Sequence, residues 1–244
     1  MALDLSVVLP GYNAAYNLEK MVLAASSFFQ KHHILGEIIF VDDGSTDETS
    51  ALLPSLQRQT PSLKVLRHPS NRGKGAAVRT GVLHASGEKI LFLDSDMPYL
   101  FDSVPHALEQ EADIVIGSRV LPESRFIVSR KRLPLIYLRH LMGRALNLYV
   151  RLLLQVRCTD TQVGFKLFSR RAAQMLFPSL TRTGFSFDIE LLYLAQRHQL
   201  SLLEVPVTIE DNSRSTVRLW RDSLLFFWDV LMIRLNGLRG AYDE

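Results

Sequence analysis

The sequence predicts an α/β fold with a mostly parallel central sheet flanked by helices. Apolar runs of about five residues alternate with longer amphipathic segments through the first half of the chain. Most of these runs have apolar residues at successive positions rather than at every second one, as in strands buried on both faces of a parallel sheet. The amphipathic segments between them have the pattern of the helices that connect parallel neighbours.

The first half contains the clearest elements. We expect strands at Leu5–Leu9, Glu37–Val41, Leu63–Arg67, Lys89–Leu93 and Asp113–Gly117, and helices at Ala15–Phe29 and Gly75–Ala85. A further helix should follow the second strand, with Ser45 or Thr46 as its N-cap and Glu48 in its first turn.

The second half is richer in helix. We expect helices at Leu133–Leu154 and Phe187–His198, strands at Gly164–Phe168 and Ser201–Ile209, and a terminal amphipathic helix at Val217–Leu235. The sequence has no repeat, low-complexity tract or linker, and 244 residues suit one large domain with C-terminal amphipathic helices.

Composition limits where the protein works. Cys158 is the single cysteine, so no intrachain disulfide forms and a reducing, cytoplasmic compartment is expected. No Cys and His cluster offers a zinc site, and the first nine residues do not resemble a signal peptide. Charged residues interrupt the apolar segment 219–238, so it does not qualify as a membrane span. We expect a soluble or peripheral protein.

Positive charge is concentrated although the formal net charge is only +3. Between residues 119 and 157 one acidic residue, Glu123, stands against nine basic ones: Arg119, Arg125, Arg130, Lys131, Arg132, Arg139, Arg144, Arg151 and Arg157. Such a segment suits phosphates, anionic lipid or nucleic acid. Together with Trp220, Phe226, Phe227 and Trp228 of the last helix it offers a membrane contact. The alternatives are a core-facing apolar stripe with solvated arginines, and homodimer packing.

Asp94-Ser95-Asp96 is the most informative motif. It directly follows a buried strand, so both carboxylates are expected at the carboxyl edge of the sheet, where open α/β folds bind ligands. Two carboxylates suit Mg²⁺ or Mn²⁺ bridging a diphosphate, since these ions leave positions for phosphate oxygens. The alternative is a turn whose Asp residues cap the next helix.

Two further motifs suit a nucleotide. Asp42-Asp43-Gly44-Ser45-Thr46-Asp47 offers carboxylates to ribose hydroxyls or a base, or else only a helix N-terminus rich in acids. The segment 71–79 has small residues that let the backbone approach an anion, together with Lys74 and Arg79. Neither a P-loop nor a dinucleotide fingerprint fits that segment, because His68, Gly75 and Val78 occupy the diagnostic positions.

Two other strand ends add candidates. In Pro10-Gly11-Tyr12-Asn13, Tyr12 suits stacking on a base and Asn13 suits hydrogen bonding to it, and a plain turn is the alternative. Arg119 follows the fifth strand, which places its guanidinium near the same edge of the sheet; an ordinary surface charge is the alternative. Four strand ends with nucleotide-suited or phosphate-suited groups make coincidence a poor explanation.

The order of these motifs resembles the family 2 glycosyltransferases of GT-A fold, which use a nucleotide-diphosphate sugar with Mg²⁺ or Mn²⁺. The likeness covers about the first 120 residues. Residues 160–168 and 185–192 resemble the dolichyl- or polyprenyl-phosphate hexosyltransferases, and Asp-Thr-Gln-x-Gly-Phe-Lys is nearest to the phosphoglucose-lipid branch. The resemblance implies one domain, 1–244, with a nucleotide-sugar and metal half at 1–120 and an acceptor and membrane-facing half at 121–244.

The resemblance also implies residue roles. Asp94 and Asp96 would hold the metal, Arg119 would face the transferring phosphates, and Asp160 and Gln162 would line the acceptor side. The donor-binding set would comprise Pro10, Tyr12, Asn13, Asp42, Asp43, Lys74, Arg79 and Ser95. Where relatives often have Gly-x-Ser-Lys for the acceptor phosphate, this chain offers Arg214 or Arg218. Ala14 replaces a common Glu, and Pro98 replaces the Gln that serves several mannosyl relatives as a third metal ligand.

These features predict an inverting hexosyltransferase acting on polyprenyl or dolichyl phosphate at the cytoplasmic face of a membrane. UDP-glucose is favoured as donor over GDP-mannose. A lipid phosphate is already an anion and needs no general base, whereas a hydroxyl acceptor would require Asp160, Asp188 or Glu190. A soluble or protein acceptor, and less favourably a nucleotidyltransferase, are the alternatives. A nucleic-acid partner is not expected, because it would not explain the acidic strand ends.

Overall fold

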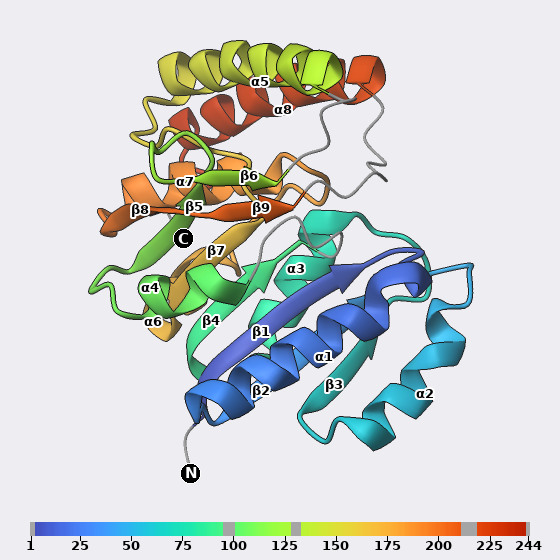
Figure 1. The fold of residues 1–244 in the computed structure, drawn as a ribbon. Coiled ribbons are helices and arrows are strands. Elements are labelled where there is room, and N and C mark those ends of the chain that lie inside the picture. Colours follow the sequence, from blue (N-terminus) through green and yellow to red (C-terminus); the bar gives the residue numbers. More distant parts are fainter. Residues whose placement is uncertain (1–2, 95–100, 128–132, 211–218, 243–244) are drawn as a thin grey trace.

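The computed structural model describes residues 3–94, 101–127, 133–210 and 219–242. A seven-stranded sheet in the order β3-β2-β1-β4-β7-β5-β8 forms its centre, with helices on both faces (Figure 1). The strands are β1 (Leu3–Gly11), β2 (Gly36–Asp42), β3 (Leu63–Arg67), β4 (Gly87–Leu93), β5 (Ile114–Ser118), β7 (Phe165–Ser169) and β8 (Leu202–Pro206). The predicted α/β class with a mostly parallel sheet is confirmed.

The helices follow the predicted alternation through the first half. They are α1 (Ala15–His32), α2 (Thr49–Gln59), α3 (Lys74–Leu83), the 3-10 turn η1 (Phe101–Ser103), α4 (Val104–Leu108), α5 (Leu133–Leu154), α6 (Arg170–Leu176), α7 (Phe187–Arg197) and α8 (Leu219–Leu238). The predicted capping of α2 by Ser45 or Thr46 is wrong, since α2 begins at Thr49 after Glu48, which makes no side-chain cap. Ser45 instead accepts a hydrogen bond from the backbone of Asn13 at 2.9 Å.

One strand of the sheet runs against the others. The pairs β1–β2, β1–β4, β2–β3 and β5–β8 are parallel, whereas β7 is antiparallel to both β4 and β5. The amino end of β7 therefore lies at the same edge as the carboxyl ends of β1, β2, β4 and β5. This reversal brings residues 160–164, which precede β7, to the edge where the first-half motifs end.

The predicted strand Ser201–Ile209 is wrong as a single element. It divides at Val207 into β8, which pairs with β5, and β9 (Thr208–Glu210), which pairs with β6 (Arg125–Ile127) in a separate two-stranded sheet. Val207 is buried against the side of Gly117. The residues on both sides of Val207 are strand-like, so the sequence does not reveal that the chain changes sheets there.

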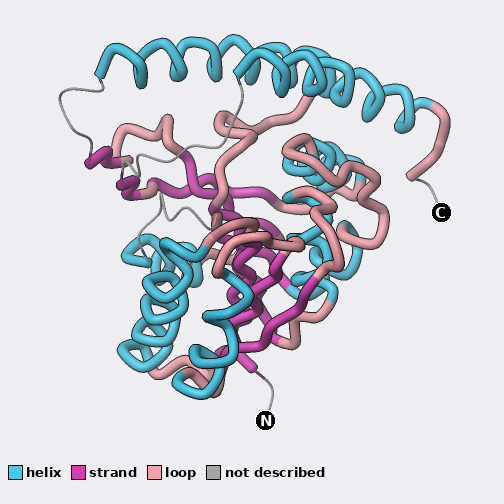
Figure 2. The backbone as a smooth tube through the Cα atoms, turned by 90° about the vertical axis from the view of Figure 1, so that its right-hand side faces the viewer, coloured by secondary structure: helices cyan, strands magenta, loops and turns pink. Residues whose placement is uncertain are grey.

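Helices α5 and α8 form a layer at the end of the molecule remote from α2 (Figures 1 and 2). The Tyr149 and Phe227 rings pack with centroids 4.8 Å apart and join the two helices. Helix α8 buries Phe226, Val230 and Ile233, while Trp228 points away from the core. No helix among the described residues is long and apolar enough to span a bilayer.

Candidate functional site

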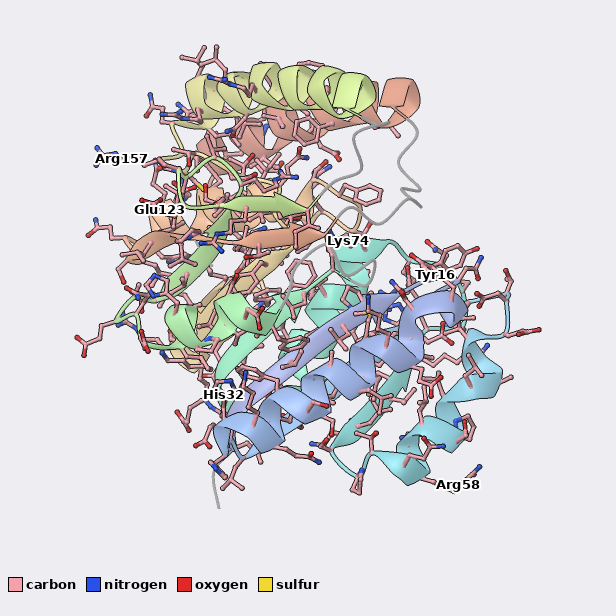
Figure 3. All side chains as sticks on the ribbon, viewed as in Figure 1. Tyr16, His32, Arg58, Lys74, Glu123 and Arg157 are labelled. Atoms are coloured by element: carbon pink, nitrogen blue, oxygen red, sulfur yellow. The ribbon has the colours of Figure 1, made fainter. Side chains whose placement is uncertain are left out.

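The predicted strand ends do meet at one edge of the sheet. Gly11 ends β1, Asp42 ends β2, Asp94 follows β4 and Ser118 ends β5. Ser95 and Asp96 lie outside the described residues, so Asp94 is the described member of the proposed metal pair. Figure 3 shows Lys74 at the start of α3, between the lower half of the molecule and the layers above it.

Asp94 is one of four charged side chains that form a cluster with Lys74, Asp188 and Lys166. The Lys74 Nζ lies 2.6 Å from Asp94 Oδ1 and 4.0 Å from Asp188 Oδ2. Lys166 Nζ donates to Asp188 Oδ1 at 2.5 Å and to the Val163 carbonyl at 2.5 Å. Burial raises the pKa of Asp188, and the charges of Lys166 and Lys74 oppose that rise. The alternation of cation and anion compensates charges that would be costly to bury alone.

Aromatic rings surround the Lys74 ammonium. Its Nζ lies 5.3 Å from the ring centroid of Phe92, 5.8 Å from that of Phe185 and 5.9 Å from that of Phe187. Ring faces attract cations, more strongly where water is excluded. The lysine is therefore held by rings and carboxylates together.

Gly164 packs directly against Asp94 and limits where its side chain can lie. The Asp94 amide donates to the Gly164 carbonyl at 2.9 Å. A Cβ added at Gly164 would lie 2.0 Å from both Cγ and Oδ2 of Asp94. Only glycine allows this contact, which explains the glycine in the segment before β7.

Arg119 and Asp160, predicted for opposite reactants, bind each other. Arg119 Nε and Nη2 donate to the two carboxylate oxygens of Asp160, each at 2.7 Å, and the Arg119 amide donates to Oδ2 at 3.0 Å. Burial acts to raise the Asp160 pKa, but the hydrogen bonds and charge of Arg119 outweigh it, so the pKa lies below its usual range. Glu204 fixes the preceding loop by accepting hydrogen bonds from the Thr159 and Asp160 amides.

Asp43 organises the glycine-rich loop. Its Oδ1 accepts a hydrogen bond from the Arg72 amide at 2.9 Å and its Oδ2 from the Gly73 amide at 2.8 Å, while His68 Nδ1 lies 2.6 Å from Oδ1. Gly73 has a φ of 97°, which an L side chain rarely adopts. Asp43 thus shapes the entry to α3 and the position of Lys74.

Asp42 and Asn13 brace the loop that follows β2. Asp42 is fully buried and accepts hydrogen bonds from the Ser45 amide at 2.8 Å and the Ser50 hydroxyl at 2.9 Å. Asn13 Oδ1 accepts one from the Thr46 amide at 2.8 Å. Pro10 is buried in β1, and Tyr12 is exposed beside this loop. Direct nucleoside contact by these residues stays a prediction.

The remaining predicted residues fall in three places. Arg79 donates to the carbonyls of Phe177 at 2.8 Å and Pro178 at 2.7 Å, tying α3 to the end of α6. Gln162 is half-buried in the segment between Asp160 and Gly164. Arg214 and Arg218 lie outside the described residues.

Gly164 and Lys166 belong to this cluster but had no predicted role, and Asp188 was predicted only as a base for a hydroxyl acceptor. All three lie in the segments 160–168 and 185–192 that carried the family resemblance. Lys166 sits in an apolar run, where a single buried lysine is itself the signal, since lysine is almost never fully buried unless paired.

The chain is similar to known proteins in sequence. The family model described as glycosyl transferase family 2 matches residues 6–177. The chain is 33% identical over 253 residues to dolichyl-phosphate beta-glucosyltransferase of Dictyostelium discoideum, covering 98% of this chain and 76% of that protein. It is 35% identical over 256 residues to the protein of the same name in Homo sapiens, covering 98% and 77%.

A solved structure shares the fold. It is glucosyl-3-phosphoglycerate synthase from Mycobacterium tuberculosis in complex with Mn²⁺, uridine diphosphate and glucosyl-3-phosphoglycerate. The TM-score is 0.62 at 22% sequence identity, over 96% of this chain and 79% of that chain. The strand-end motifs, the matched family model and the relatives that match 98% of this chain lead to one conclusion: this chain belongs to glycosyl transferase family 2 and has the GT-A fold.

Proposed function

We propose that this chain transfers glucose from UDP-glucose to dolichyl or a related polyprenyl phosphate, with inversion at the anomeric carbon. A phosphate oxygen of the lipid would attack the anomeric carbon while its bond to the nucleoside diphosphate breaks. The names of relatives that match 98% of the chain support the choice of sugar and acceptor. GDP-mannose is the second candidate donor.

One observation supports an acceptor that is already an anion: each of the three carboxylates predicted as a general base already binds another group of the protein. Both oxygens of Asp160 bind Arg119, and Asp188 Oδ1 binds Lys166. Glu190 accepts hydrogen bonds from the Thr181 and Arg182 amides and from the Tyr242 hydroxyl. A hydroxyl acceptor would need one of these carboxylates to take a proton. An acceptor that is already an anion, such as a lipid phosphate, does not.

A divalent metal fits the donor chemistry at the end of β4. Asp94 supplies one carboxylate with its charge partner in place, and Asp96 would supply the second. Mg²⁺ and Mn²⁺ prefer such hard oxygen ligands. When bound, the metal would stabilise charge on the departing diphosphate. Asp43 and Lys74 would position the donor phosphates through the loop that enters α3.

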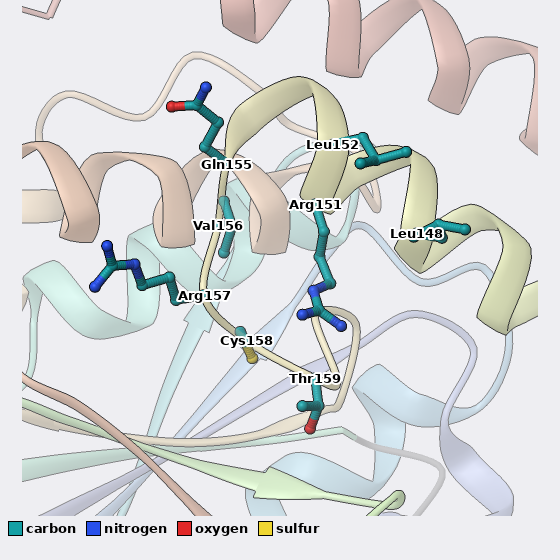
Figure 4. Close-up of a pocket in the computed structure, with 8 residues that line it drawn as sticks. All are labelled: Leu148, Arg151, Leu152, Gln155, Val156, Arg157, Cys158 and Thr159. Atoms are coloured by element: carbon teal, nitrogen blue, oxygen red, sulfur yellow. The ribbon is translucent and has the colours of Figure 1, made fainter.

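The surface near α5 supports a membrane-borne acceptor. A hollow of about 610 Å³ lies at the end of α5, lined by Leu148, Arg151, Leu152, Gln155, Val156, Arg157, Cys158 and Thr159 (Figure 4). It combines exposed leucines with two arginines, and Thr159 of its lining directly precedes Asp160 in the sequence. Such a mixture suits a lipid near an anionic headgroup. We therefore place peripheral membrane contact on this layer, at the cytoplasmic face.

Transfer of radiolabelled sugar to polyprenyl phosphate in detergent tests the proposal. UDP-glucose and GDP-mannose are compared with Mn²⁺ or Mg²⁺, beside Asp94→Ala and Asp96→Ala variants. Butanol-extractable label from UDP-glucose that requires metal and both carboxylates is the expected result. Metal-dependent donor hydrolysis without labelled lipid would assign the acceptor elsewhere, to a soluble or protein hydroxyl. Failure to bind either donor would overturn the proposal.

A further inference from the structure

We propose that Lys74 is an internal counter-ion that holds Asp94 and makes metal binding depend on the nucleotide. In the free protein the ammonium would occupy Asp94. When metal and nucleotide diphosphate enter together, the ammonium would move towards Asp188 and the diphosphate. This inference rests on the proposed function, because it assigns the metal to Asp94.

Lys74 lies between two carboxylates. Its Nζ contacts Asp94 Oδ1 at 2.6 Å and lies 4.0 Å from Asp188 Oδ2. A small rotation of the lysine side chain would therefore move the ammonium from one carboxylate to the other. The aromatic rings of Phe92, Phe185 and Phe187 lie 5.3–5.9 Å from the ammonium. Ring faces attract a cation without fixing its direction, so they stabilise the ammonium near either carboxylate.

Asp188 is held ready as the second partner. Lys166 binds its Oδ1 at 2.5 Å, while Oδ2 faces Lys74. Lys166 is 0% exposed and its ammonium also donates to the Val163 carbonyl, so it anchors Asp188 and leaves the exchange to Lys74. The Lys74 side chain is 18% exposed, so it is the less buried of the two lysines of the cluster.

Charge balance explains the dependence on nucleotide. The two lysines and two aspartates of the cluster carry no net charge together. A divalent cation at Asp94 would add two positive charges beside the Lys74 ammonium, in a site where water screens poorly. The diphosphate of the donor would offset that charge and offer Lys74 a new anion. Metal alone should therefore bind weakly, and metal with nucleotide tightly.

Mn²⁺ binding measured by electron paramagnetic resonance tests this inference with the full chain and no sugar or lipid. In the wild type, UDP should tighten Mn²⁺ binding roughly tenfold or more, and by linkage Mn²⁺ should tighten UDP binding by the same factor. Lys74→Met removes the charge but keeps the length. It should bind Mn²⁺ without UDP roughly tenfold tighter than the wild type, and UDP should then add little.

Lys64→Met is the matched control, because Lys64 forms an ion pair with Glu37 at 2.5 Å on the far strands of the sheet. It should bind Mn²⁺ like the wild type. Circular dichroism and thermal unfolding verify that each variant is folded. As a second variant, Asp188→Asn removes the charge of the alternative partner and should weaken the coupling between Mn²⁺ and UDP.

Two results would overturn the inference in different ways. If Lys74→Met binds Mn²⁺ without UDP no better than the wild type, while UDP still enhances binding, the counter-ion role is wrong and the proposed function stands. If the wild type binds neither Mn²⁺ nor UDP, both the inference and the proposed function are wrong.

Discussion

At the scale of single residues, Asp94 is placed by contacts that the linear order of the chain hides. Lys74 approaches it from α3, and Gly164 packs against its carboxylate from the segment before β7. The contact with Gly164 restricts the positions that the Asp94 carboxylate can take before any ligand arrives. Preorganisation of this kind reduces the entropy lost on binding.

Gly164→Ala should lower glycosyl transfer at least tenfold, because the new methyl group would overlap the Asp94 carboxylate and displace it. Displacement of a positioned group by about 1 Å costs on the order of a hundredfold in rate. Steady-state transfer assays measure the loss. Gly184→Ala is the control, since a Cβ there would meet nothing within 4 Å. Equal activity of the two variants would contradict the role of Gly164.

Acid stability should depend on Asp160. Its folded-state pKa lies below the unfolded value of about 3.9, so its contribution to stability is present above about pH 4 and is lost as pH falls through the folded pKa. Asp160→Asn should therefore destabilise the protein at pH 7, and its difference from the wild type should shrink below pH 4. Urea unfolding at several pH values measures this. A difference that does not change with pH would contradict the Arg119 explanation.

At the scale of elements, α8 is tied to the loop that borders Lys74. Asp229 of α8 accepts a hydrogen bond from the Ser186 hydroxyl at 2.6 Å and pairs with Arg182 at 3.1 Å. The same loop contributes the Thr183 carbonyl, which accepts from the Ala76 amide at 3.2 Å. Beyond α8, Tyr242 donates to Glu190 Oε1 at 2.7 Å. The last helix therefore supports the cluster although it contributes no residue to it.

Tyr242→Phe should lower the free energy of unfolding by about 1.5–3 kcal/mol, the range for a hydrogen bond to a charged group. Burial and the neighbouring Glu190 raise the pKa of Tyr242, so the phenol donates over the whole ordinary pH range. Denaturant unfolding measures the change. Tyr12→Phe, at an exposed tyrosine directly after β1, should change stability by less than about 0.5 kcal/mol. A similar small change at Tyr242 would mean that its hydrogen bond contributes little.

At the scale of the whole molecule, the α5–α8 layer leaves large apolar side chains in solvent. Leu152 is 73% exposed next to the exposed Arg151 of α5, and Trp228 of α8 is 61% exposed. Scattered exposed leucines are ordinary, but aromatic and aliphatic groups beside arginines suit an anionic bilayer surface. The layer lies at one end of the molecule, so the rest of the fold is free to face the aqueous side (Figure 1).

A Leu152→Ser, Trp228→Ser double variant should bind anionic vesicles roughly tenfold or more weakly, because each replaced side chain contributes on the order of 1.5–3 kcal/mol when buried. Binding of the wild type should also weaken as salt screens the arginines. Co-sedimentation with vesicles measures both effects. Leu35→Ser is the control, because Leu35 is 51% exposed at the amino-terminal edge of the sheet. Equal binding by both variants would place the membrane contact elsewhere.

The sequence by itself determined the family and most of the sheet. The strand Leu63–Arg67 and the helix Leu133–Leu154 have the predicted bounds, because apolar periodicity fixes an element locally. The Asp94-Ser95-Asp96 motif, which is predicted to hold a metal, was also visible in the sequence, since its two carboxylates are near neighbours in the chain.

Tertiary structure decided which distant groups meet. Local pattern did not reveal that β7 runs antiparallel, and this reversal brings Gly164 to Asp94 and Lys166 to Asp188. It also did not reveal that Arg119 and Asp160, which were predicted to face different reactants, bind each other. Pairing across 41 residues depends on sheet order and on the charge compensation that burial demands, and neither is encoded within a single segment.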